Sequence, residues 1–277
     1  MDAHIWQGVV TDLGLKFSFL MDVMLALSAT QIAAEADSAQ ARSTYTSIAL
    51  EYQNSAVIAA RPELLNVCAD NCNALFGFTI LNIPTSVVLA QLPTGGEDTG
   101  KSPLESIVIS SEWISCLVSL MTAAEPWLRH GPFKEAYDNC DDPEMYDETM
   151  RQPMQRLTSL LARSKYAGRE YTQQFKMFSH AVELLEERAM RSRSMSIAWP
   201  AEIGDVFVQM LKERDQMALM ITLHWGVVLH SLKNWWTDFT GKRLVDQISQ
   251  ELPRESGVAE EAVRWARIHV GLDSQET

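Results

Sequence analysis

One stretch near the carboxyl end constrains the fold of this chain more than any other. It runs from Trp199 to Leu252 and reads WPAEIGDVFVQMLKERDQMALMITLHWGVVLHSLKNWWTDFTGKRLVDQISQEL. At about 100° per residue, the apolar residues between Gln216 and Trp236 cover two opposite faces of a helix. One face carries Met217, Met220, Ile221, His224, Val228, Ser231 and Trp235, and the other carries Leu219, Leu223, Gly226 and His230. A helix that is apolar on both sides is buried, so we predict that this helix is the centre of the molecule.

The other apolar segments repeat at the same helical spacing, and none shows the alternation of a β-strand. The fold class predicted is therefore all-α, as a single domain over residues 1–277 with about 8 to 11 helices around the central one. A segment rich in proline, glycine and aspartate predicts a loop over 92–103. The polar segment 126–150 is expected to be irregular, and residues 273–277 are expected to fray.

Prolines set several of the expected helix boundaries. A helix over 41–60 is predicted to end at Arg61-Pro62, because Pro62 suits the first turn of a following helix over 62–81. Beyond Asn82 the sequence loosens, although the apolar letters SVVLAQL could extend that helix. A further helix over 104–125 is expected to stop near Glu125-Pro126.

Composition and charge exclude some functions. The net charge is −13, and the 23 Lys and Arg residues are dispersed along the chain, so we expect no direct binding of nucleic acid. The longest apolar candidates are broken by Asp22, His224 and Lys233, so no membrane span is expected. The first residues resemble no signal peptide, and the location predicted is intracellular, either cytoplasmic or nuclear.

No metal or cofactor is expected from the cysteines. The four are Cys68, Cys72, Cys116 and Cys140. Cys68 and Cys72 are one helical turn apart, but two thiols without a matching second pair do not make a structural zinc site. Buried, reduced side chains are the favoured interpretation.

Two short motifs resemble ligand sites but lack their context. Gly95–Ser102 fits the letters of a phosphate-binding loop, yet no strand precedes it and Pro103 follows, so a surface loop is favoured. The letters DDPE at 141–144 are similar to the acidic metal motif of terpene cyclases, but no second metal motif accompanies them. The exposed start of a helix is the favoured interpretation there.

Parts of the chain resemble a known family. The WP turn at 199–200, the runs FVQMLKERDQMALMI and LHWGVVLHSLKNWW, and the amphipathic GKRLVDQISQEL are similar to the C-terminal effector domain of fungal zinc-cluster transcription factors of the sterol uptake control type. A second match is FSFLMDVMLALSATQIAAE at Phe17–Glu35. The six-cysteine zinc cluster of that family is missing from this sequence. Either this is the effector part alone, or it is a stand-alone relative with another role.

Two functions remain open. The resemblance implies a regulatory domain that binds a sterol or a terpenoid-like molecule in an apolar pocket, either as a monomer or as a homodimer. The alternative is an enzyme of fungal secondary metabolism on the same scaffold, a cyclase that promotes a cofactor-independent cyclisation or pericyclic step of Diels–Alder type, with His224 as the catalytic residue. The predicted pocket is lined by Met21, Met24, Trp113, Met121, Met217, Met220, Ile221, His224, Val228, Ser231 and Trp235. An ordinary hydrogen-bonded core histidine is the competing interpretation of His224.

Overall fold

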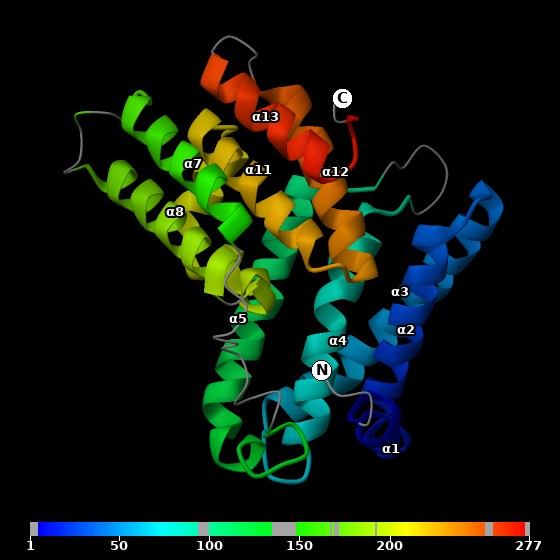
Figure 1. Ribbon diagram of the computed structural model, residues 1–277. Helices are drawn as coiled ribbons and strands as arrows, with labels where there is room; N and C mark the ends of the chain where they lie inside the picture. Colours follow the sequence, from blue (N-terminus) through cyan, green and yellow to red (C-terminus); the bar gives the residue numbers. More distant parts are fainter. Residues whose placement is uncertain are drawn as a thin grey trace. The chain divides into compact units, whose positions relative to one another are not determined.

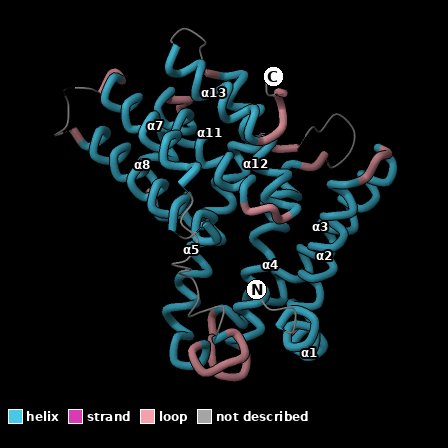
Figure 2. Tube along the Cα trace, viewed as in Figure 1, coloured by secondary structure: helices cyan, strands magenta, loops and turns pink. Residues whose placement is uncertain are grey.

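A computed structural model describes residues 5–93, 100–134, 148–166, 168, 172–191, 193–252 and 257–274. Within these ranges the regular elements are all helices, and no strand occurs (Figures 1 and 2). The predicted all-α fold class is thereby confirmed. The helices group into two compact units, Met1–Cys140 and Asp141–Thr277. The assignment of the whole chain to a single domain stays a prediction.

The first unit is built from long helices that follow one another along the chain. These are η1 (Ile5–Val9), α1 (Val10–Lys16), α2 (Ser18–Glu35), α3 (Ala39–Leu64), α4 (Cys72–Gln91) and α5 (Pro103–Leu128). Phe17 separates α1 from α2 because its backbone is extended, with φ −119° and ψ 107°. Helices α2 and α3 lie side by side, as do α4 and α5 (Figure 1). Ser102 starts α5 with a capping box, in which Ser102 and Glu105 satisfy each other's backbone amides.

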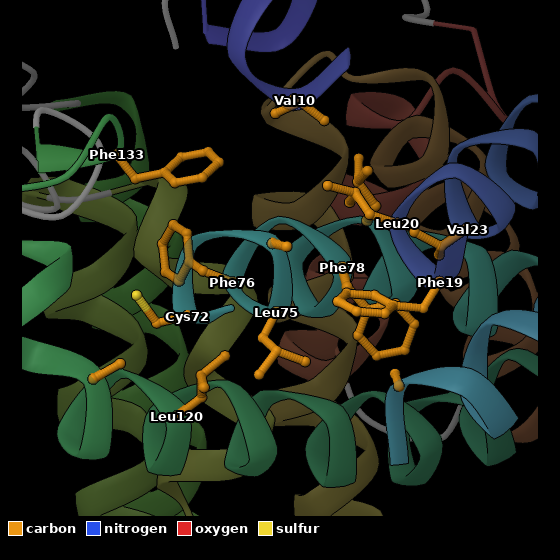
Figure 3. Packing of buried hydrophobic residues seen from close by; sticks show 14 of the residues in the cluster. Val10, Phe19, Leu20, Val23, Cys72, Leu75, Phe76, Phe78, Leu120 and Phe133 are labelled. Atoms are coloured by element: carbon orange, nitrogen blue, oxygen red, sulfur yellow. The ribbon is translucent and has the colours of Figure 1, made fainter. Parts of the chain in front are cut away.

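Aromatic side chains hold the core of the first unit together (Figure 3). The ring of Phe78 on α4 meets Phe19 of α2 edge-on at 5.7 Å, and Trp113 of α5 at 6.0 Å. Nearer the start of α4, Phe76 meets Phe133 at 5.1 Å. Edge-to-face pairs of this kind stabilise a core beyond the area that they bury.

Three prolines lie inside helices, which corrects the predicted boundaries. Helix α3 continues through Pro62 to Leu64, α4 continues through Pro84 to Gln91, and α5 includes Pro126. A proline in a helix interior costs about 3 kcal/mol locally. Along α4 nearly every side chain is buried, so tertiary packing outweighs this local cost.

The longest apolar runs were expected to be those broken by Asp22, His224 and Lys233, and this was wrong for α4. Its 20 residues contain no charged side chain, and both α4 and α5 are long and apolar enough to cross a membrane by length and composition. The apolar window of α4 is 83% buried inside the protein, as in the core helix of a globular protein, and the window of α5 is 25% buried. Two such helices are weak evidence for a membrane span.

The second unit contains shorter helices around α11. They are η2 (Glu148–Met150), α7 (Arg151–Arg163), α8 (Gln173–Arg191), η3 (Arg193–Ala198), α9 (Trp199–Glu202), α10 (Asp205–Lys212), α11 (Gln216–Ser231), α12 (Trp235–Glu251) and α13 (Gly257–His269). Every residue of α11 from Met217 to Leu229 is buried. Helices α7, α8, α10, α12 and α13 all contact it, so α11 is the centre of this unit.

Helix α11 ends earlier than predicted. The sequence pattern extended it to Trp236, but the last helical residue is Ser231. Lys233 then takes a left-handed backbone with φ 58°, and Asn234 precedes the first turn of α12. Trp235 therefore starts the next helix and does not continue the face of His224. The apolar sequence pattern continues across the turn between the two helices, so the pattern alone does not mark the end of α11.

The other expected irregular segments are only partly described. The loop predicted over 92–103 lies between α4 and α5, with 94–99 outside the described residues. Most of 126–150 also lies outside them. At the carboxyl end, Arg267 donates hydrogen bonds of 2.8 and 2.9 Å to the carboxylate of Asp273, so the predicted tail is held at its first residue.

Candidate ligand-binding site

Asp215 fixes the start of α11. Its Oδ1 accepts hydrogen bonds from the backbone amides of Met217 (2.9 Å) and Ala218 (3.2 Å), which makes it the N-cap of the helix. Its Oδ2 accepts from the hydroxyl of Tyr166 at 2.9 Å and pairs with the Nζ of Lys165 at 2.7 Å. Burial acts to raise the pKa of Asp215, but these hydrogen bonds outweigh it and hold the pKa below its ordinary value of 3.8. The buried carboxylate thus joins α11 to the end of α7.

His224 lies two turns further along α11 and is fully buried. Its Nδ1 is 2.8 Å from the carbonyl oxygen of Met220, one turn back. A carbonyl can only accept a hydrogen bond, so Nδ1 carries the proton and donates it. In the neutral ring Nε2 is then a bare acceptor, and this atom has no hydrogen-bond partner among the described residues.

The imidazole is neutral at physiological pH. Burial lowers the pKa of His224 from 6.5 to about 4, because a charged ring would lose its hydration inside the protein. The bond to the Met220 carbonyl acts in the opposite direction, and the positive charge of Arg156 adds to the lowering. The tautomer with hydrogen on Nδ1 is therefore the state in which this side chain acts.

Two further helices reach His224. The indole of Trp265 on α13 stacks on the imidazole, with ring centroids 5.1 Å apart and planes 27° apart. Trp265 also contacts the ring of His269, with centroids 4.9 Å apart and planes tilted by 44°. Arg156 of α7 pairs with Glu261 of α13 at 3.1 Å, which ties these two helices together. The site is therefore built from α7, α11 and α13.

The predicted lining residues of the second unit have different surroundings. The buried ones are Met217, Met220, Ile221, His224 and Val228. Ser231 is half-buried, and its hydroxyl donates to the carbonyl of Val228 at 2.6 Å, so its proton is used within the helix. Trp235 is half-buried at the start of α12. The cavity beside this face stays a prediction.

The predicted lining residues of the first unit take part in the packing of that unit. Met24, Trp113 and Met121 are partly buried and pack against its apolar core. Met21 lies beside Gly14 of α1, where a Cβ would meet its Cε at 3.4 Å. Their role as a wall facing α11 stays a prediction.

Sequence reasoning missed Trp265, Arg156 and Asp215 as parts of this site. Only Asp215 gives a local signal, since an aspartate directly before an apolar helical run is a typical N-cap. Trp265 and Arg156 belong to amphipathic helices far from His224 in the sequence. Nothing in the spacing of those helices shows which neighbour they meet.

The remaining motifs provide no metal or phosphate site in the part of the chain that the structure describes. Most of the phosphate-loop letters lie at 94–99, and DDPE lies at 141–144, both outside the described residues. Cys68, Cys72 and Cys116 are free, and burial raises the pKa of both the Cys72 and the Cys116 thiol. Cys140 also lies outside the described ranges. No group of three or more His, Cys, Asp or Glu that could hold a metal occurs among the described residues.

The buried imidazole predicts an acid-sensitive fold. Because the pKa of His224 is near 4 in the folded protein and 6.5 in its ordinary state, the unfolded chain binds the extra proton first as the pH falls. We expect His224 to contribute a loss of about 2 kcal/mol in the free energy of unfolding between pH 7 and pH 5. Urea unfolding of the native protein and of His224→Phe at both pH values measures this loss. The free energy of unfolding should fall more steeply with falling pH in the native protein than in the variant. Equal slopes would contradict the assignment.

With its fold and this site, the chain belongs to the class of all-helical proteins with a buried polar group on a central apolar helix. No protein-family model matches it, and no curated protein matches it with significance.

Proposed function

We propose that this protein binds an apolar small molecule, and that a polar group of this ligand meets Nε2 of His224. One observation carries the proposal: Nε2 of His224 is buried and has no hydrogen-bond partner among the described residues. A buried polar atom without a partner costs about 1–3 kcal/mol, so such atoms are rare unless a water, an ion or a ligand satisfies them. A neutral imidazole acceptor suits an uncharged ligand better than an ion.

The residues around His224 favour an apolar ligand. Met217 and Met220 share its helix, and methionine adapts to irregular apolar shapes. Trp265 supplies a flat aromatic wall against the imidazole. Small-molecule sites usually combine such apolar walls with a few polar groups that orient the ligand. A sterol or terpenoid-like molecule, which the resemblance to the fungal effector domains implies, is of this type.

Binding is better supported than catalysis. A general base works best when its pKa lies near the working pH. The pKa of His224 is about 4, so the imidazole is a weak base at neutral pH, although it remains a good hydrogen-bond acceptor. We therefore propose the ligand-binding role of a regulatory domain, with occupancy of the site as the signal.

The test compares two histidines that make the same local contacts. His224 and His269 each donate Nδ1 to the carbonyl four residues back, and the ring of each contacts Trp265, but His269 is exposed. An asparagine amide can replace Nδ1 but does not reach the position of Nε2. We expect His224→Asn to fold and to bind the ligand about tenfold more weakly, which is the worth of one hydrogen bond.

The ligand is identified first, by native mass spectrometry of the protein purified from its own host. Affinities of the native protein, of His224→Asn and of the control His269→Asn are then measured by calorimetry with that molecule. The control is expected to bind as the native protein does. If no small molecule accompanies the protein, or if both variants bind equally well, the proposal is wrong.

A further inference from the structure

We infer that the site selects ligands with a hydroxyl group over the corresponding ketones, ethers and carboxylates. This inference rests on the proposed function and names the class of ligand. Its basis is the direction of the unsatisfied hydrogen bond at His224. Nε2 can receive a hydrogen and has none to give, so it pairs with a donor on the ligand.

The contact with Met220 fixes this direction. Nδ1 lies 2.8 Å from the Met220 carbonyl oxygen. If the hydrogen moved to Nε2, the lone pair of Nδ1 would face the lone pairs of that carbonyl at the same distance. Turning the ring by 180° would place Cδ2–H at the carbonyl and lose the hydrogen bond to Met220, and Trp265, stacked on the ring, opposes smaller rotations out of its plane. The imidazole therefore stays an acceptor at Nε2 when a ligand arrives.

Protonation does not provide a donor either. Arg156 of α7 is a charged group that acts on the ring from a neighbouring helix; its positive charge disfavours a charged imidazole, and it pairs with the exposed Glu261 of α13 at 3.1 Å. Arg156 also donates to the backbone carbonyl of Glu261 at 3.4 Å. His269, the other titratable group beside Trp265, is exposed and donates to the Trp265 carbonyl. Among the described residues, the carboxylate of Glu261 is engaged with Arg156 and is not free to stabilise a charged His224.

An anionic ligand is disfavoured by the same arrangement. A carboxylate on the ligand would place its oxygen lone pairs against the lone pair of Nε2. The guanidinium that could neutralise it is already engaged with Glu261. A ketone or an ether also meets Nε2 with lone pairs only, and it leaves two acceptors unpaired in a buried place. A hydroxyl satisfies Nε2 by donating its hydrogen.

The experiment uses matched pairs of probes that differ only at the polar group. Borneol and camphor form a small pair, and cholesterol and its 3-ketone form a large one. Binding to the native protein, to His224→Asn and to His269→Asn is measured at pH 7.5 by calorimetry and by the fluorescence of the tryptophans. We expect the native protein and His269→Asn to prefer the alcohol about 10- to 100-fold, as one unpaired buried group implies. In His224→Asn this preference is expected to disappear.

Two sets of results would overturn the inference. Equal binding of alcohol and ketone by the native protein, or a preference that survives in His224→Asn, overturns the inference while leaving the proposed function intact. Failure of all four probes to bind the native protein at their solubility limits, together with the absence of a co-purified molecule, overturns the proposed function and the inference with it.

Discussion

Replacing Asp215 with alanine is expected to lower the free energy of unfolding by about 3 kcal/mol at pH 7. The carboxylate caps α11 through the amides of Met217 and Ala218, and loss of a cap costs about 1 kcal/mol. The same side chain accepts from the hydroxyl of Tyr166, which is buried. Without Asp215 this hydroxyl loses its partner, at a further cost of about 1–3 kcal/mol. Urea unfolding followed by circular dichroism measures the change.

Asp215→Asn is the matched control. Asparagine caps a helix about as well as aspartate. With its oxygen on the cap, its NH2 group takes the place of Oδ2 and can donate to the Tyr166 hydroxyl, which then accepts. The lost ion pair with Lys165 is worth less than about 1 kcal/mol, because the lysine side chain is exposed. The stabilisation by the native carboxylate is present at neutral pH and is lost in acid, as the pH falls through the depressed pKa of Asp215. A loss as large for asparagine as for alanine would show that the charge, and not the cap, stabilises α11.

The helices themselves could be predicted because their apolar periodicity can be read directly from the sequence. In α10 the apolar letters recur at helical spacing, and Phe207 and Leu211 are buried. The pattern of two apolar faces on α11 also predicted its burial, and the structure buries it from Met217 to Leu229. In both cases local spacing and burial follow the same rule.

Boundaries were less predictable, because local rules compete with tertiary packing there. Pro84 is a helix-breaking signal, yet the buried surroundings of α4 hold the helix through it. Lys233 is the opposite case. Lysine favours helices, but at this position it takes a left-handed backbone and ends α11. The boundary signal nearby is Asn234, the N-cap residue of α12.

The candidate site was half predictable. The helical face of His224 followed from spacing, and its apolar neighbours on α11 followed with it. The stacking of Trp265 on His224 depends on how α13 packs against α11. The two residues are 41 positions apart in the sequence (265 − 224). The free Nε2 depends in turn on a hydrogen bond to Met220 that fixes the tautomer. Neither feature has a pattern in the sequence.

The crossing of α11 and α12 offers the other large effect. At Gly241 of α12, an added Cβ would lie 2.6 Å from the backbone oxygen of Gly226 and 2.8 Å from the backbone nitrogen of His230. Both contacts are with the main chain of α11, which cannot turn aside as a side chain can. The other glycine of the pair is less constrained. A Cβ at Gly226 would meet side-chain atoms of Val245 and Leu244, at 3.1 and 3.3 Å.

Gly241→Ala is therefore expected to push α12 away from α11 and to lower the free energy of unfolding by about 3 kcal/mol, at the upper end of overpacking effects. This is the net loss, after the gain of about 1 kcal/mol that alanine brings to a helix interior. Gly226→Ala should cost about 1 kcal/mol, because the methyl groups of Val245 and Leu244 can shift. At Gly257, where a Cβ would meet nothing within 4 Å, alanine should leave the stability unchanged or raise it slightly. Urea unfolding of the three variants tests this order, and a Gly241→Ala protein as stable as the native one would contradict the close approach of the two helices.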